Sequence, residues 1–220
     1  MDIERVGIIG DPHAESVLLE SAIITLQRAG VDTLLCTGDV VTGVGDANRC
    51  CHLLESNDVY TVRGNHDRWF FSGGYAETLP DFTPQSALDL RARAWLAALP
   101  VTLTFDTPRG ALMLAHGTGT SDMLAVYPDD GDWVLQANWR LNALHAERQL
   151  RFLVGGHTHQ RMLRTFDHLT LLNPGTLRHD KLPGFLLADF GAGTVTTYTI
   201  EPETLAVSAG QARALDGAAG

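Results

Sequence analysis

The chain has 220 residues, a formal net charge of −10 and 45% hydrophobic residues, which fits one globular domain of ordinary size. Its acidity argues against general binding to nucleic acid or anionic membranes. No apolar run reaches the roughly 20 residues of a membrane span, and the N-terminal segment has no signal-peptide pattern. Three cysteines (Cys36, Cys50 and Cys51) are too few for a disulfide framework, so we expect a cytoplasmic protein.

The first quarter of the sequence alternates strand and helix signals. Short apolar runs at 6–9, 32–37 and 58–62 predict three buried strands, each ending at a turn-forming polar or glycine residue. Apolar residues at helical spacing over 18–26 predict a helix that Gly30 ends, and 47–56 predicts a weaker helix. Because helices of this length separate the strands, the pattern indicates right-handed crossovers and a largely parallel sheet.

The middle of the chain has more helical character. Ser86 followed by Asp89 resembles a capping box, and the helix that it would begin is stopped by Pro100. Two strands are expected at 101–105 and 111–115, joined by a turn. After a polar turn at 129–132, helical spacing predicts one continuous helix over about 133–145.

The rest of the chain is rich in strands. Beyond an apolar run at 152–154, strands are expected in four further segments: 162–166, 169–172, 185–190 and 195–200. We therefore expect a single domain over residues 1–200. The segment 201–220 is rich in Ala and Gly and is predicted to be a loose helix or a frayed tail.

Side chains that bind metals follow five of the predicted strands directly. They are Asp11, His13, Asp39, Asn65, His66, Asp67, His116, His157 and His159. Ligands of open α/β sheets collect beyond the carboxyl ends of strands, so these five loops are expected to converge on one crevice. Nitrogen and oxygen ligands without thiolate favour Mn, Fe, Zn, Ni or Co, and a shared carboxylate such as Asp39 would offset the repulsion between two such ions. The remaining positive charge would suit a phosphoryl group.

The five strand-end motifs occur in an order that points to one family. They are D-P-H at 11–13, G-D at 38–39, G-N-H-D at 64–67, H-G at 116–117 and G-H-T-H at 156–159. Together they resemble the calcineurin-like metallophosphoesterase family, over about Val6 to His179. The N-P-G-T turn at 173–176 is similar to that of its small single-domain bacterial and archaeal members. The resemblance implies an α/β fold, a four-layer α/β/β/α sandwich.

The resemblance also implies two metal-binding sets that share one carboxylate. One set is Asp11, His13, Asp39 and His159; the other is Asp39, Asn65, His116 and His157. The implied cofactors are two divalent transition-metal ions, with manganese favoured.

The same resemblance assigns the catalytic groups. His66 would face substrate as the general acid, with Asp67 or a nearby group orienting it. The reaction would be in-line attack of a metal-bridging hydroxide on phosphorus, without a covalent phosphoenzyme.

Three further residues are expected to contact a small, nucleotide-like phosphate ester. Arg63 would bind phosphate, although it could equally pair with a carboxylate. Trp69 would stack on a base or aryl group, against the alternative that it packs in the core. Arg178 follows the N-P-G-T turn and would reach phosphate, against the alternative of a solvated loop residue.

The favoured function is hydrolysis of phosphodiesters, ahead of phosphomonoesters. One alternative is a protein or dinucleotide-polyphosphate phosphatase. The serine/threonine phosphatases of this fold continue G-D with V-D-R-G, whereas this chain reads G-D-V-V-T-G over 38–43, which weakens that alternative. An alternative of another class is a non-catalytic metal-binding scaffold, like the phosphoesterase-like subunit of retromer.

Overall fold

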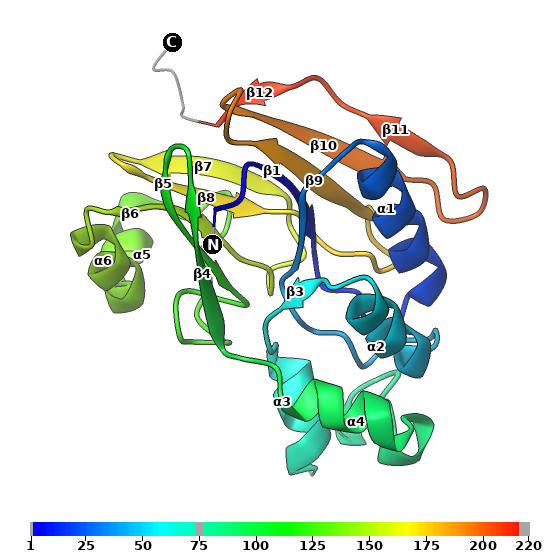
Figure 1. Cartoon of the computed structure of the whole chain (residues 1–220). Helices are drawn as coiled ribbons and strands as arrows, with labels where there is room; N and C mark the ends of the chain where they lie inside the picture. The colour runs from blue at the N-terminus through cyan, green and yellow to red at the C-terminus, as the bar shows by residue number, and fades with distance from the viewer. Residues whose placement is uncertain (1, 74–76, 216–220) are drawn as a thin grey trace.

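Two β-sheets stacked face to face, each with helices on its outer side, make up the fold (Figure 1). The computed structural model describes residues 2–73 and 77–215. The four-layer α/β/β/α order that the sequence predicted is confirmed.

The first sheet contains both the beginning and the end of the described chain. Its main path runs in the order β11, β10, β9, β1, β2, β3, and β12 also pairs with β10. The bounds are β1 (Arg5–Ile9), β2 (Thr33–Cys36), β3 (Tyr60–Thr61), β9 (Gly184–Asp189), β10 (Thr194–Ile200), β11 (Val207–Ala209) and β12 (Arg213–Ala214). β1 is central, since it pairs parallel with β2 on one side and antiparallel with β9 on the other.

The second sheet runs in the order β4, β5, β6, β8, β7. The bounds are β4 (Thr102–Thr107), β5 (Gly110–Ala115), β6 (Leu150–Val154), β7 (Met162–Phe166) and β8 (Leu169–Asn173). Each sheet holds a parallel trio, β1–β2–β3 or β5–β6–β8, beside antiparallel strands. The parallel arrangement predicted from the first quarter of the chain is confirmed for β1, β2 and β3. The hairpins β4–β5, β7–β8 and β9–β10 add antiparallel pairs, because their short turns permit only antiparallel pairing.

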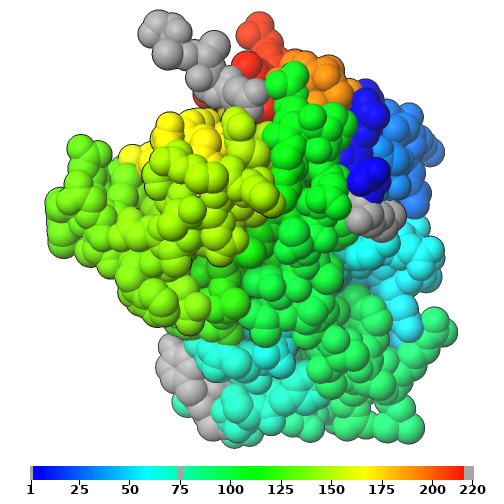
Figure 2. Space-filling model, turned by 60° about the vertical axis from the view of Figure 1, so that its left-hand side comes forward, coloured from blue at the N-terminus to red at the C-terminus, as the bar shows by residue number. Residues whose placement is uncertain are grey.

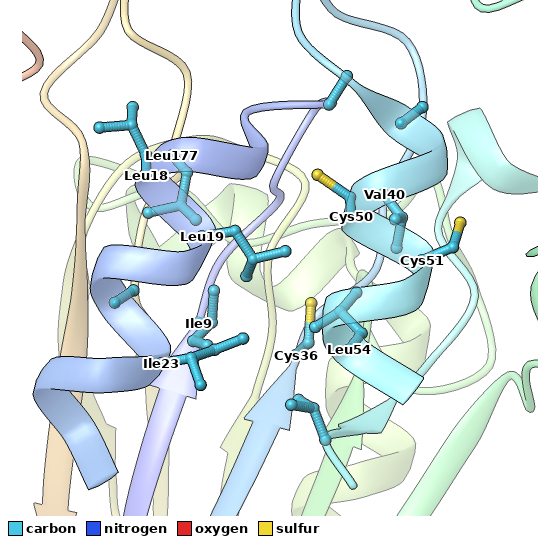
Figure 3. Packing of buried hydrophobic residues seen from close by; sticks show 14 of the residues in the cluster. Ile9, Leu18, Leu19, Ile23, Cys36, Val40, Cys50, Cys51, Leu54 and Leu177 are labelled. Atoms are coloured by element: carbon cyan, nitrogen blue, oxygen red, sulfur yellow. The ribbon is translucent and has the colours of Figure 1, made fainter. Parts of the chain in front are cut away.

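Three apolar cores separate the four layers. Helices α1 (Ser16–Arg28), α2 (Ala47–Ser56) and α4 (Leu90–Ala97) contribute to the core on the outer face of the first sheet. Figure 3 shows Leu19 and Ile23 of α1 and Leu54 of α2 pointing toward Ile9 and Cys36 of the sheet. The second core fills the space between the sheets.

The third core lies on the outer face of the second sheet, under helices α5 (Asp132–Ala137) and α6 (Trp139–Ala146). The single helix predicted over 133–145 is thus two helices. Asn138 causes the break, because its backbone is non-helical and its side chain accepts a hydrogen bond from the amide of Leu141 as the N-cap of α6. Figure 2 shows the face of the molecule formed mainly by the middle of the chain, which includes this layer.

The helix expected after Ser86 begins later than the capping-box pattern predicted. Residues Gln85–Ala87 form a 3-10 turn, and Asp89 is itself the N-cap of α4, accepting from the amide of Ala92. The remaining helix, α3 (Asn65–Ser72), follows β3 directly. It therefore begins with the G-N-H-D motif.

The prediction of a loose helix or frayed tail is wrong for the part of 201–220 that the structure describes. The strands β11 and β12 pair antiparallel with β10, whose outer edge would otherwise present unpaired backbone groups. Residues 216–220 lie outside the described part of the chain. Among residues 2–73 and 77–215, no helix has the length and apolar character needed to cross a bilayer.

Candidate metal centre

Seven predicted ligands from five loops meet at the carboxyl ends of the strands. The loops after β1 and β2 supply Asp11, His13 and Asp39, and Asn65 is the first residue of α3. The loops after β5 and β6 supply His116, His157 and His159. Five of the seven are almost completely buried, with an exposed fraction of at most 2%. The convergence that the sequence predicted is therefore present.

The first ligand group consists of Asp11, His13, Asp39 and His159. One ligand atom from each lies within 4.8 Å of the others. The Nε2 atoms of His13 and His159 are 2.9 Å apart, and His159 Nε2 is 3.5 Å from Asp11 Oδ2. His13 Nε2 lies 3.8 Å from Asp39 Oδ2, so two carboxylates and two imidazoles surround one position.

The second ligand group shares Asp39 with the first. Asn65 Oδ1 is 2.8 Å from both His116 Nε2 and His157 Nδ1. His116 Nε2 is also 3.3 Å from Asp39 Oδ2, the same oxygen that faces His13. One carboxylate oxygen thus stands between both groups, which is the geometry of a candidate dinuclear site.

Backbone carbonyls determine which nitrogen two of the histidines present. His13 Nδ1 is 2.8 Å from the carbonyl oxygen of Thr42, and His116 Nδ1 is 2.8 Å from that of Thr37. A carbonyl only accepts, so each Nδ1 carries the proton and each Nε2 of the neutral ring presents a lone pair to the centre. His116 Nε2 then faces two oxygen acceptors, Asn65 Oδ1 and Asp39 Oδ2, and either a metal ion or a proton on Nε2 satisfies all three atoms.

The carboxylates are oriented by hydrogen bonds from other loops. Thr37 Oγ1 donates to Asp11 Oδ1 at 2.6 Å, and the amide of His157 donates to Asp11 Oδ2 at 2.8 Å. The amide of His66 donates to Asp39 Oδ1 at 2.8 Å, which leaves Oδ2 directed at the imidazoles. These bonds hold both carboxylates before any ion binds.

The electrostatics of the centre call for positive charge. Burial lowers the pKa of His13 to about 4, so that ring is neutral. Burial also acts to lower the pKa of His116, but the charges of Asp39 and Asp11 outweigh it and raise the value to about 10. The pKa of Asp39 lies far below its usual range, because the charge of His116 overcomes the effect of burial. Without a metal, a proton on His116 supplies the cation.

The backbone at four ligands is in the left-handed region, where side chains are disfavoured. The φ angles are 44° at His13, 50° at Asp39, 64° at His157 and 57° at His159. Each such residue costs on the order of 1–3 kcal/mol, and this strain clusters at functional sites. The loops thus keep an unfavourable conformation that directs ligands inward.

Two motif glycines are required by the close approach of a ligand carboxylate. A Cβ at Gly64 would lie 2.1 Å from Asp39 Oδ1, and one at Gly156 would lie 2.2 Å from Asp11 Oδ1. No side chain fits at such distances. The glycines of G-N-H-D and G-H-T-H therefore make room for the carboxylates.

His66 lies at the edge of the centre. Its Nε2 is 4.0 Å from Asp39 Oδ2, and its ring packs against His13 and Trp69 with centroids 4.9 and 5.0 Å apart. Within the described residues, its buried Nδ1 has no partner. Burial lowers the pKa of this ring, which favours the neutral form.

Asp67 does not orient His66, contrary to the sequence-based expectation. Its Oδ1 accepts from the amides of Val40 and Val41, at 2.8 and 3.3 Å, and its Oδ2 accepts from the amide of Gly64 at 2.9 Å. The side chain is completely buried. Because all three bonds go to the backbone beside Asp39 and Asn65, Asp67 joins two ligand loops and is a structural residue.

The three predicted substrate contacts differ in position. Trp69 lies beside His66, at the edge of the centre, with the two ring centroids 5.0 Å apart. The guanidinium of Arg178 binds Asp180 through two hydrogen bonds, at 2.8 and 3.1 Å, so its charge is directed to its own loop. The amide of Arg63 donates to the carbonyl of Pro100. A substrate contact of any of the three stays a prediction.

Two supporting residues were missed from the sequence. Thr37 donates to Asp11, and its carbonyl orients His116. Asn173 donates to the carbonyl of Gly156 at 2.7 Å and accepts from the amide of Gly175 at 2.8 Å. The only signal for Thr37 is a polar residue at the end of a buried strand, whereas Asn173 begins the N-P-G-T turn already noted.

Solved structures with the same fold include metal-binding proteins and phosphoesterases. A metallophosphoesterase from Sphaerobacter thermophilus is 22% identical, with a TM-score of 0.68 over 90% of this chain and 88% of that one. An archaeal phosphodiesterase is 15% identical, with a TM-score of 0.57 over 89% and 99%. Vps29 of Entamoeba histolytica in complex with zinc is 18% identical, with a TM-score of 0.55 over 96% and 99%. These likenesses show the fold.

Sequence comparison identifies the family. An uncharacterized protein of Methanocaldococcus jannaschii is 27% identical over 62 residues, which are 28% of this chain and 26% of that protein. The match thus spans about a quarter of that curated relative. The model of the calcineurin-like phosphoesterase superfamily domain matches residues 5–193. The chain therefore belongs to the calcineurin-like phosphoesterase superfamily, as its strand-end motifs predicted.

Proposed function

We propose that this protein is a dinuclear metal-dependent phosphoesterase that hydrolyses phosphodiesters in preference to phosphomonoesters. The observation that carries the proposal is the position of Asp39 Oδ2, 3.8 Å from His13 Nε2 and 3.3 Å from His116 Nε2. A single oxygen between two sets of nitrogen and oxygen ligands is the feature that two adjacent divalent ions require.

Bound divalent ions would supply the positive charge that activates water and neutralises phosphoryl oxygens. The chain's own part is to hold the ligand atoms in place through the hydrogen bonds to Asp11, Asp39 and the imidazoles. His66 stands at the edge of the centre, where its ring would protonate the leaving alkoxide. Since burial favours its neutral form, it would take up a proton before each transfer.

Manganese is the favoured metal, with iron, zinc, nickel and cobalt as alternatives. The donor set of imidazole nitrogens, carboxylates and one amide oxygen contains no thiolate, which disfavours a purely structural zinc site. The zinc complex of the structural neighbour from Entamoeba histolytica supports a centre that accepts more than one metal.

The proposed substrate is a small phosphate ester with an aromatic or nucleotide-like group. Trp69, beside His66, is the side chain on which such a group would stack. The net charge of −10 disfavours general binding of large polyanions. The expectation of a cytoplasmic location is supported by three free, buried cysteines, whose thiol pKa values are raised by burial.

The test is hydrolysis of bis(p-nitrophenyl) phosphate beside p-nitrophenyl phosphate by metal-stripped protein refilled with Mn²⁺, Ni²⁺, Mg²⁺ or Zn²⁺. We expect turnover of the diester to return with Mn²⁺. His116→Ala and Asn65→Ala should each lose one metal and abolish turnover. His52→Ala, which changes a histidine of α2 away from the centre, is the matched control and should retain both.

The outcomes separate the alternatives. Turnover of the monoester alone would replace the diesterase assignment with a phosphatase. Two bound metals without turnover of either ester would contradict the enzymatic proposal and favour a metal-binding scaffold, a role for which the likeness to Vps29 is the supporting observation.

A further inference from the structure

A second cluster of metal-binding side chains lies at the opposite end of the second sheet. His145 is in the last turn of α6, while Asp167 and His168 form the turn between β7 and β8. One ligand atom from each residue lies within 4.8 Å of the others. The cluster adjoins the start of β8, whereas the metal centre lies beyond the ends of β6 and β8, two parallel five-residue strands. The two places are thus separated by roughly 17 Å along the strands.

The spacing of the ligand atoms is close to that of a tetrahedral transition-metal site. Asp167 Oδ2 is 3.3 Å from His168 Nδ1 and 3.8 Å from His145 Nε2. Ligands about 2.1 Å from a tetrahedral zinc ion are about 3.4 Å apart, so movements of a few tenths of an ångström suffice for these two contacts. The side chains of His145 and Asp167 are 39% and 62% exposed, which leaves them room for this movement.

His168 is the fixed member of the cluster. Its side chain is 11% exposed, and its carbonyl accepts a hydrogen bond of 2.8 Å from Arg151 Nε. Its Nδ1 lies 3.0 Å from Arg148 Nη1. Because a guanidinium only donates, this Nδ1 accepts and presents its lone pair to the cluster.

A cation already occupies part of the cluster. The same Nη1 atom of Arg148 donates to Asp167 Oδ2 at 2.6 Å, so one NH2 group contacts two of the three ligand residues. The side chain of Arg148 is 71% exposed. An exposed ion pair of this kind contributes little to stability, and a competing cation can displace it.

We propose that His145, Asp167 and His168 form a third metal site, for a borderline divalent ion such as Zn²⁺, Ni²⁺ or Co²⁺. Two imidazoles and one carboxylate match these ions and disfavour Mg²⁺ and Ca²⁺, which prefer oxygen ligands. Arg148 takes the place of the ion when the site is empty. With three protein ligands, the bound ion keeps coordination positions open for water. The ion therefore exchanges readily with ions in solution.

A bound ion would join α6 to the β7–β8 turn. His145 comes from the helical layer, and the other two ligands come from the sheet that this layer covers. The ring centroids of His145 and His168 are already 4.8 Å apart. The ion would act as a cross-link that stabilises the folded state, independently of the proposed hydrolysis.

The experiment measures zinc per chain by equilibrium dialysis and elemental analysis. We expect the unmodified protein to bind one equivalent more than His145→Ala, His168→Ala or Asp167→Asn, and zinc to raise its Tm more than theirs. Arg148→Gln should bind this equivalent about two- to fivefold more tightly, because the competing ion pair is lost. His52→Ala is the matched histidine control and should bind as the unmodified protein does.

The result separates this site from the metal centre. Hydrolysis by His145→Ala should be unchanged, and His116→Ala should keep the third equivalent while losing metal from the centre. Equal zinc binding by the unmodified protein and Asp167→Asn, an exposed substitution that leaves the core intact, would overturn the proposal. Weaker zinc binding by Arg148→Gln would also overturn it, because the guanidinium would then be part of the site.

Discussion

The backbone amide of His66 donates a 2.8 Å hydrogen bond to Asp39 Oδ1, which joins residues that are 27 positions apart. The other oxygen of the same carboxylate faces His13 and His116. A backbone hydrogen bond thus joins the residue of the proposed acid, His66, to the shared ligand, Asp39. Because the bond does not involve the imidazole, His66→Ala should retain both metals and slow esters with poor leaving groups far more than nitrophenyl esters.

Stacking of Trp69 on an aromatic group of the substrate would affect KM, whereas its effect on kcat should come from the position of His66. Its ring lies 5.0 Å from that imidazole, which has no hydrogen bond to hold it within the described residues. We expect Trp69→Ala to lower kcat for alkyl esters about tenfold to a hundredfold, and Trp69→Phe to retain most of it. The measurement is kcat for paired alkyl and nitrophenyl esters, with Trp133→Ala, which is 77% exposed, as control. Equal losses on both esters would contradict this role.

Gly64→Ala should weaken metal binding without unfolding the chain. The added Cβ would lie 2.1 Å from Asp39 Oδ1 and 2.4 Å from the backbone nitrogen of Asp39, so the loop itself must move. We expect metal affinity to fall at least about tenfold, as when supporting groups of a metal ligand are changed. Gly131→Ala is the matched control, because nothing lies within 4 Å of its added Cβ. Metal content equal to that of the control would show that the loop accommodates the methyl group.

Asp67→Ala should destabilise the fold. The substitution leaves the buried amides of Val40 and Gly64 without their acceptor, at a cost of roughly 3 kcal/mol in the free energy of unfolding. Urea unfolding measures this loss. The activity that remains per bound metal should keep the pH profile of the unmodified protein, whereas a changed profile would restore the catalytic role that the sequence suggested.

Asp89 should make the stability sensitive to acid. The pKa of Asp89 is lowered to about 2, chiefly by the hydrogen bond from the amide of Ala92 and to a smaller extent by the bond with His52. Because the unfolded-state pKa is higher, at about 3.9, the stabilisation is present above pH 4 and is lost as the pH falls through 2. Urea unfolding of metal-stripped protein between pH 5 and 2 should therefore show a shallower slope for Asp89→Asn. Identical slopes would refute the assignment.

The ligands of the centre could be predicted because each one follows a strand. A short apolar run that ends in a polar residue indicates the carboxyl end of a buried strand. Parallel pairing brings the carboxyl ends of neighbouring strands together, as it does for Asp11 after β1 and Asp39 after β2. The order of the layers followed from the resemblance to a family. Both inferences depend on patterns that are local in the sequence.

The role of Asp67 could not be predicted, because it depends on three backbone amides from other segments. The break at Asn138 depends on a cap that competes with helix continuation, which hydrophobic spacing does not register. The strands after residue 201 depend on the open edge of β10, a property of the assembled sheet.

The position of β1 between β2 and β9 has a consequence for biosynthesis. β9 begins at Gly184, so β1 waits until the long intervening segment has been synthesised before its second edge is covered. Arg5 then pairs with Asp189 at 2.9 Å, a contact between residues 184 positions apart. Such distant pairing slows folding and leaves an apolar edge open to other nascent chains. The loop with Asp11 and His13 therefore becomes firmly seated only after β9 has been synthesised and has paired with β1.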